Sequence, residues 1–161
     1  MSREWTVTEH IHIPTTPADA YRAVADPKRM PDWSPECVGV WTRSDGPAAV
    51  GTKFVGWNRK SYFLWFTTCK VVTADPNKEF AFEVTSFGLP IAKWGYRFTP
   101  DGDGTSVTEY WEDRRTSGTS ARVAEVLGRV FTGTPAEVRG ERNHIGMRTT
   151  LERMKTELSR T

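Results

Sequence analysis

The sequence predicts an α+β fold in which an antiparallel sheet of seven strands packs against a long C-terminal helix. Apolar and polar residues alternate with period two in one segment near the N-terminus and in six segments between residues 37 and 113. Short turn sequences such as "DPNK" and "PDGDG" separate neighbouring segments, which indicates antiparallel pairing. After residue 120 the apolar spacing becomes that of a helix.

The first strand is expected over residues 3–13, "REWTVTEHIHI", where Glu9 is a polar interruption of the apolar face. A helix follows, because Thr16 is a suitable N-cap and Pro17 a suitable first helical residue. Tyr21 and Val24 give this helix an inner face.

The stretch "DPKRMPDWSPEC", residues 26–37, holds three prolines. It predicts a short turn or a second short helix over residues 28–33 rather than a long helix. It also contains Trp33. A large aromatic side chain in a turn-rich segment either fills the core or lines the opening of a ligand site, and the segment alone leaves both interpretations open.

Six further strands are predicted at residues 37–43, 51–59, 62–73, 79–86, 91–99 and 105–113. Alternation assigns their faces, so Lys93 and Arg97 oppose Trp94 and Tyr96. The face predicted to be concave is rich in aromatic residues and carries Trp65, Thr67, Cys69, Val71, Phe80, Phe82, Val84, Trp94, Tyr96 and Phe98.

The C-terminal part predicts two helices, at about residues 120–132 and 135–159. Thr134 and Pro135 form the start signal of the second helix. One apolar stripe at helical spacing gives this helix a face to pack on the sheet: Met147, Leu151, Met154 and Leu158.

At 161 residues the chain is expected to form one domain, residues 1–161, with a single sizeable core. The 22 basic residues nearly balance the 20 acidic ones, so the net charge indicates neither a nucleic-acid partner nor a membrane partner. The mean hydropathy is −0.54, and no apolar run reaches the roughly 18 residues of a membrane span. The first residues lack the apolar segment of a signal peptide, so we expect a cytoplasmic protein.

Metal and cofactor sites are not expected. Cys37 and Cys69 match no metal-binding spacing and are predicted to be buried, reduced thiols. His10 and His12 alternate along the first strand without a third ligand. The sequence contains no Gly-rich phosphate loop and none of the common hydrolase motifs.

Three stretches of the sequence resemble one known protein group. "VADPKRMPDWSPEC" is similar to its hinge between the second helix and the second strand, and "AKWGYRFTPDGDGTSVTEYWE" is similar to its last two strands. "GMRTTLERMKTEL" is similar to its terminal helix. The group is the START-like superfamily, and within it the polyketide cyclase/dehydrase and lipid-transport group of SRPBCC proteins. The resemblance implies a helix-grip fold, in which a curved sheet wraps around the C-terminal helix and encloses an apolar cavity.

Glu109 is predicted to point into this cavity, because Val107 and Trp111 share its face of the last strand. An uncompensated buried polar group costs roughly 2–7 kcal/mol, so Glu109 needs a partner. Candidate partners on the helix are Arg142, Asn143 and His144. A Glu109–His144 pair is either a catalytic acid and base acting on an enolisable ligand or a structural hydrogen bond that closes the sheet onto the helix.

The remaining residues predicted to contact a ligand are Trp33, Trp65, Phe82, Trp94, Tyr96, Trp111, Asn143 and Met147. With this site the chain is expected to bind a small, largely apolar ligand, whether aromatic, lipid or polyketide-like, without a cofactor. The first alternative is a cofactor-independent polyketide cyclase, aromatase or dehydratase that uses the same cavity, with Tyr96 as an orienting donor. The second is a protein-interaction module of the chaperone-activator type. A monomer and a homodimer are both compatible with the sequence.

Overall fold

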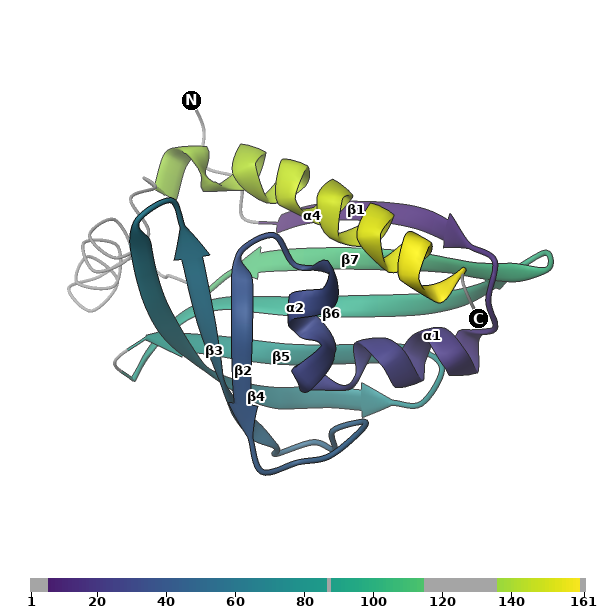
Figure 1. The fold of residues 1–161 in the computed structure, drawn as a ribbon, viewed down its shortest axis with the longest axis horizontal. Coiled ribbons are helices and arrows are strands. Elements are labelled where there is room, and N and C mark those ends of the chain that lie inside the picture. The colour runs from purple at the N-terminus through teal and green to yellow at the C-terminus, as the bar shows by residue number, and fades with distance from the viewer. Residues whose placement is uncertain (1–5, 87, 115–135, 160–161) are drawn as a thin grey trace.

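The computed structural model describes residues 6–86, 88–114 and 136–159. Figure 1 shows one curved sheet with a long helix lying across it. The elements in chain order are β1 (Thr6–Ile13), α1 (Pro17–Val24), the 3-10 helix η1 (Pro27–Arg29), α2 (Met30–Trp33), β2 (Cys37–Thr42), β3 (Lys53–Lys60), β4 (Phe63–Asp75), β5 (Glu79–Ser86), β6 (Leu89–Asp101), β7 (Gly104–Asp113) and α4 (Ala136–Leu158).

The described strands form one seven-stranded sheet in the order β1-β7-β6-β5-β4-β3-β2, and every pair is antiparallel. This confirms the predicted helix-grip topology. Strand β6 differs from its predicted bounds by two residues at both ends, because it runs over Leu89–Asp101 rather than over residues 91–99. Pro90 has no N–H to donate, and it is accommodated because the β5–β6 register shifts between Val84 and Thr85.

Helix α1 begins at the predicted cap. The Thr16 hydroxyl accepts a hydrogen bond from the Asp19 backbone N–H at 3.1 Å, and Pro17 occupies the first turn. Tyr21 and Val24 are buried. The two short helices η1 and α2 follow and end at Trp33, as the proline-rich stretch predicts.

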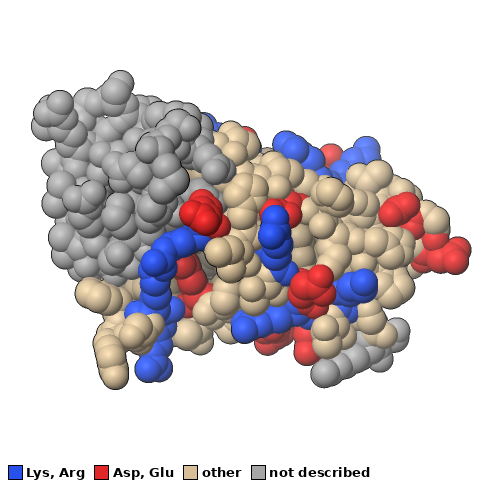
Figure 2. Space-filling model, turned by 90° about the horizontal axis from the view of Figure 1, so that it is seen from above, with Lys and Arg blue, Asp and Glu red and all other residues tan. Residues whose placement is uncertain are grey.

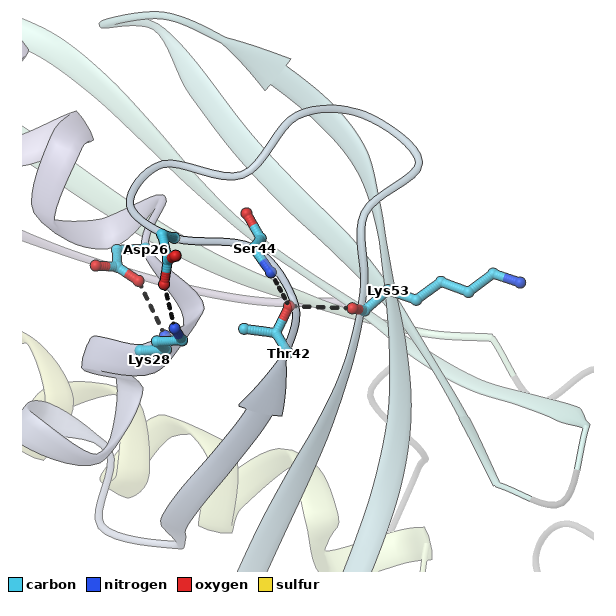
Figure 3. A network of polar contacts seen from close by, with 6 residues as sticks. Asp26, Lys28, Thr42, Ser44 and Lys53 are labelled. Atoms are coloured by element: carbon cyan, nitrogen blue, oxygen red, sulfur yellow. Dashed lines mark hydrogen bonds and ion pairs between the residues drawn. The ribbon is translucent and has the colours of Figure 1, made fainter.

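Hydrogen bonds hold the loop between β2 and β3 against η1 (Figure 3). The Asp26 carboxylate caps η1 by accepting from the Lys28 backbone N–H at 3.1 Å, and the Lys28 ammonium pairs with Asp45 in the loop. The Thr42 hydroxyl donates to the Lys53 carbonyl at 3.3 Å and accepts from the Ser44 backbone N–H at 3.2 Å. These contacts fix η1, and α2 directly after it, at one end of the sheet.

The two faces of the sheet follow the predicted alternation. Tyr96 is buried on the concave side, whereas Arg97 is exposed on the convex side. Tyr110 lies on the convex face, where the Arg97 guanidinium is 4.4 Å from its ring centroid, but it is only 2% exposed. Its ring covers Gly95, where an added Cβ would lie 2.1 Å from Tyr110 Cζ, and its hydroxyl donates to Glu79 at 2.5 Å.

Helix α4 packs mainly on β1 and α2 and lies across the concave side of the sheet (Figure 1). It buries the predicted stripe of Met147, Leu151, Met154 and Leu158. The helix predicted at residues 120–132 lies outside the described residues. None of the described helices has the length and apolar character needed to cross a membrane.

Candidate functional site

A cavity of about 230 Å³ lies between the concave face of the sheet and α4, with α2 at one end. Its walls come from strands β2 to β7, from α2 and from α4. Apolar and aromatic side chains dominate them: Met30, Trp33, Phe54, Trp65, Phe82, Val84, Ile91, Ala92, Trp94, Trp111 and Met147.

All eight residues predicted to contact a ligand line this cavity. Trp33 belongs to α2 and is 1% exposed, with the Arg29 guanidinium 5.0 Å from its ring centroid. It therefore packs in the core and forms part of the cavity wall at the same time. Trp94 also lines the cavity and is only partly buried.

Glu109 projects from β7 into the cavity and is 2% exposed. The Tyr96 hydroxyl on the neighbouring strand donates to Glu109 Oε1 at 3.1 Å. No described group lies within hydrogen-bonding distance of Oε2. Burial raises the pKa of Glu109 to about 8; the Tyr96 hydrogen bond opposes this rise and the Glu9 charge adds to it.

The structure does not bring His144 to Glu109. The Nδ1 atom of His144 lies 2.7 Å from Glu9 Oε1 on β1, and Arg148 Nε donates to the same oxygen at 3.2 Å. His144 is also absent from the described cavity wall. The reason is geometric: α4 packs mainly on β1, and neighbouring helix residues point about 100° apart. Asn143 consequently faces the cavity and His144 faces β1.

Glu9 and Glu109 are direct cross-strand neighbours in the β1–β7 register. Two carboxylates in such positions repel each other when both are ionised. His144 and Arg148 stabilise the charge of Glu9, whereas Glu109 has a tyrosine hydroxyl as its partner. The two carboxyl groups therefore differ in their surroundings: Glu9 has two basic partners at the edge of the helix, whereas Glu109 is buried and its raised pKa favours the protonated form at neutral pH.

Asn143 supplies a second buried polar group. It is 4% exposed and lines the cavity from α4. Its Nδ2 atom has no hydrogen-bond partner among the described residues. Buried donors and acceptors are normally satisfied, so the unpaired Asn143 Nδ2 on α4 and Glu109 Oε2 on β7, which line the same cavity, point to a group that enters it.

Neither cysteine is an activated nucleophile. Burial raises the pKa of Cys37 to about 11 and that of Cys69 to about 12. Both are free thiols. Among the described residues, no three His, Cys, Asp or Glu side chains are grouped so that they could hold a metal ion; His12 instead contacts Asp101 at 3.0 Å.

Several cavity residues were not predicted from the sequence. Phe54, Gly56 and Asn58 alternate along β3 and all line the cavity, so period-two spacing could have found them. Asn58 Nδ2 donates to the Thr67 hydroxyl at 3.3 Å and is thereby satisfied within the wall. Glu9 could also have been identified from the sequence as a residue that needs a polar partner, because it interrupts an otherwise apolar strand face.

Comparison with known proteins places this site in a family. The model of the family described as polyketide cyclase/dehydrase and lipid transport matches residues 4–159. The chain belongs to this family. Its membership supports a ligand-binding or cyclase role. Among curated proteins, none matches the chain significantly.

Solved structures of similar proteins agree with the fold. A Polyketide_cyc-like protein from Corynebacterium glutamicum is 28% identical, and the match covers 98% of this chain and 93% of that one with a TM-score of 0.64. A protein from Chromobacterium violaceum is 16% identical over 96% and 97% of the two chains, with a TM-score of 0.68. The di-domain ARO/CYC protein StfQ from the steffimycin biosynthetic pathway is 13% identical; the match covers 97% of this chain and 51% of StfQ, with a TM-score of 0.70.

Proposed function

We propose that the chain binds a small, largely apolar ligand, aromatic or polyketide-like, that carries a carbonyl group. One observation carries the proposal: an aromatic cavity contains two buried polar atoms, Glu109 Oε2 and Asn143 Nδ2, that no described group satisfies. Membership of a polyketide cyclase/dehydrase family and the fold shared with an ARO/CYC protein also support it.

The size and walls of the cavity favour a compact ligand. Sites for drug-sized molecules have volumes of roughly 300–1,000 Å³, and this cavity of about 230 Å³ is smaller. Aromatic rings such as those of Trp65, Phe82 and Trp111 present flat apolar surfaces to it. A ligand of one or two fused rings would fit such a space better than a long acyl chain.

The protonation of Glu109 favours a carbonyl on this ligand. Oε1 accepts the hydrogen bond from Tyr96, so the proton of a neutral Glu109 lies on Oε2, which then acts as a donor. Asn143 Nδ2 is also a donor. The cavity thus offers two unpaired donors at neutral pH, and a carbonyl oxygen is an acceptor that can satisfy them.

The groups around Glu109 determine how this donor responds to pH. Tyr96 on β6 has a pKa raised well above its ordinary value by burial, and it remains protonated. Glu9 on β1 is paired with His144 and Arg148 of α4. Among the charged residues of α4, Arg142 lines the cavity, and its side chain is exposed. Ionisation of Glu109 at about pH 8 would replace the donor at Oε2 by an acceptor.

Binding of two matched probes tests the proposal. In 2-acetylnaphthalene a carbonyl group stands where 2-isopropenylnaphthalene has a C=CH₂ group, so the two differ in hydrogen bonding far more than in shape. Quenching of tryptophan fluorescence should show that the ketone binds about tenfold more tightly or better, because the alkene leaves buried donors unpaired. Failure of both probes to bind would contradict a cavity for small aromatic ligands, and equal affinity would contradict the carbonyl contact.

The pH dependence provides an internal check. Affinity for the ketone should fall by about two- to tenfold as the pH rises through about 8, while affinity for the alkene stays constant. Glu109→Gln keeps a donor that does not titrate, so its affinity for the ketone should be constant over the same range. A pH-independent wild-type affinity would show that Glu109 does not contact the carbonyl.

A second function, catalysis, is favoured by the pKa of about 8, because a general acid works best when its pKa is close to the operating pH. In a dehydration, Glu109 would give its proton to a departing hydroxyl group and recover one from the adjacent carbon. The ligand would lose water and gain a double bond, and the carboxyl group would end unchanged. Tyr96 would orient Glu109, and His144 has no part in this step.

Glu109→Gln also separates binding from catalysis. Loss of product formation from a β-hydroxyketone, with folding and ketone affinity retained, would support a cyclase or dehydratase. If the variant formed product at the wild-type rate, Glu109 would not be catalytic. The binding proposal would be unaffected, because the comparison of ketone and alkene affinity tests it separately.

A further inference from the structure

The hairpin between β3 and β4 carries a group of exposed apolar side chains at its tip. Tyr62 is 98% exposed, Leu64 61% and Phe63 52%. Ser61, with φ of 55°, forms the tight turn that holds them at the end of the hairpin. Neighbouring apolar side chains exposed to this degree usually mark a binding surface.

The sequence segment that forms this hairpin carries charged residues of one sign. Between Asp45 and Asp75 the sequence contains no Asp or Glu, whereas it contains four basic residues: Lys53, Arg59, Lys60 and Lys70. Arg59 and Lys60 immediately precede the tip. Over the face formed by α4, in contrast, basic and acidic side chains are interspersed (Figure 2).

We propose that the tip of the β3–β4 hairpin, residues 59–64, docks the protein onto the surface of an anionic lipid bilayer. The hairpin carries apolar side chains at its tip and a basic side chain next to them, as the change from acyl chains to anionic headgroups in such a bilayer requires. Tyr62, Phe63 and Leu64 would enter the boundary between headgroups and acyl chains, to a depth of roughly 5–10 Å. Arg59 is paired across the hairpin with Leu64, one residue pair behind Lys60 and Phe63, and its long side chain can reach back to the lipid phosphates.

The hairpin also adjoins the cavity. Asn58 and Trp65 are paired across β3 and β4, and both line the cavity wall. The next two pairs toward the tip are Arg59 with Leu64 and Lys60 with Phe63. Docking would therefore bring one wall of the cavity close to the bilayer. Docking of the hairpin would be possible whatever ligand the cavity binds.

A second copy of the chain is a less suitable occupant. A twofold pairing of two hairpins would bring Arg59 and Lys60 of one copy towards the same residues of the other. A stable protein interface also buries about 800 Å² on each partner, more than a tip of three side chains is expected to supply. A negatively charged bilayer matches the hairpin in both respects, because it accepts exposed apolar side chains and attracts basic ones.

Co-sedimentation with vesicles tests the proposal. The full chain should bind vesicles of phosphatidylcholine mixed with phosphatidylglycerol, bind pure phosphatidylcholine more weakly, and lose affinity as salt is added. A variant with Tyr62→Ser, Phe63→Ser and Leu64→Ser should bind at least about tenfold more weakly. Arg59→Gln should reduce the affinity about fivefold.

Two matched controls give the test its specificity. Trp41→Ser removes an aromatic side chain that is 58% exposed on β2, and Arg153→Gln removes an exposed basic residue of α4. Neither should change vesicle binding. Absence of binding to anionic vesicles would overturn the proposal, and so would equal binding by the triple variant and the wild type. A change of oligomeric state in the triple variant, without a change in vesicle binding, would assign the hairpin to a second copy instead.

Discussion

The wild-type chain is expected to lose stability as the pH rises, and replacing Glu109 by glutamine is expected to remove this pH dependence. Burial raises the pKa of Glu109 from its ordinary value of 4.5 to about 8 in the folded chain. Between these two values the folded chain holds a proton at Glu109 that the unfolded chain has released. The stability that this carboxyl group contributes is therefore complete below pH 4.5 and is lost as the pH rises through 8.

The size of the effect follows from the proton count. One extra proton bound in the folded state lowers the free energy of unfolding by about 1.4 kcal/mol for each pH unit between the two pKa values. The interval from 4.5 to 8 then corresponds to about 5 kcal/mol. A typical domain has a total stability of roughly 5–15 kcal/mol, so the effect is large enough to measure.

The pH dependence of the free energy of unfolding can be measured by urea unfolding at constant ionic strength. The measurement is repeated at several pH values between about 5.5 and 7.5. The free energy of unfolding of the wild type should fall relative to that of Glu109→Gln by about 1.4 kcal/mol per pH unit. Glu112→Gln is the matched control, because Glu112 lies on the same strand, faces outward and pairs with Arg114. Parallel curves for the wild type and Glu109→Gln would show that Glu109 is ionised in the folded chain, and the assignment of a donor at Oε2 would then be wrong.

Three further predictions concern the surroundings of the site. Gly95→Ala should destabilise the fold by about 1–3 kcal/mol in chemical denaturation, because its Cβ would overlap the Tyr110 ring. His144→Ala should lower the melting temperature by weakening the contact of α4 with Glu9, while ketone affinity measured by fluorescence stays unchanged. Met147→Trp should fill cavity space and reduce ketone affinity by about tenfold or more, and an unchanged affinity would place the ligand elsewhere.

Local periodicity was enough to predict the cavity wall. A strand that alternates with period two has only two possible faces, so apolar neighbours assign Tyr96, Phe82 and Glu109 to the same side of the sheet. The C-terminal stripe identified the opposing helix face in the same way. These predictions depend on residues close in sequence, and a curved sheet does not change them.

The partner of His144 could not be predicted by the same argument. Glu9 and Glu109 occupy equivalent positions on neighbouring strands, and they are separated by 100 residues of sequence. Which of them meets His144 depends on the lateral position of α4 over the sheet, and that position results from the packing of the whole helix on β1 and α2. A rotation of one helix residue exchanges Asn143 and His144 between cavity and strand.

The sequence left two interpretations of Glu109, a clasp that closes the sheet onto the helix and a functional group in the cavity. Hydrogen bonds between the sheet and the helix are present in the structure, but they join Glu9, and not Glu109, to His144 and Arg148. Glu109 bonds only within the sheet, through Tyr96, and its second oxygen faces the cavity without a described partner. Glutamine would serve a purely structural role equally well, because its carbonyl can accept the hydrogen bond from Tyr96 and its amide does not ionise. The carboxyl group differs from glutamine in that it can ionise and transfer a proton, and with Oε1 bonded to Tyr96 the oxygen available for that proton is Oε2, which faces the cavity.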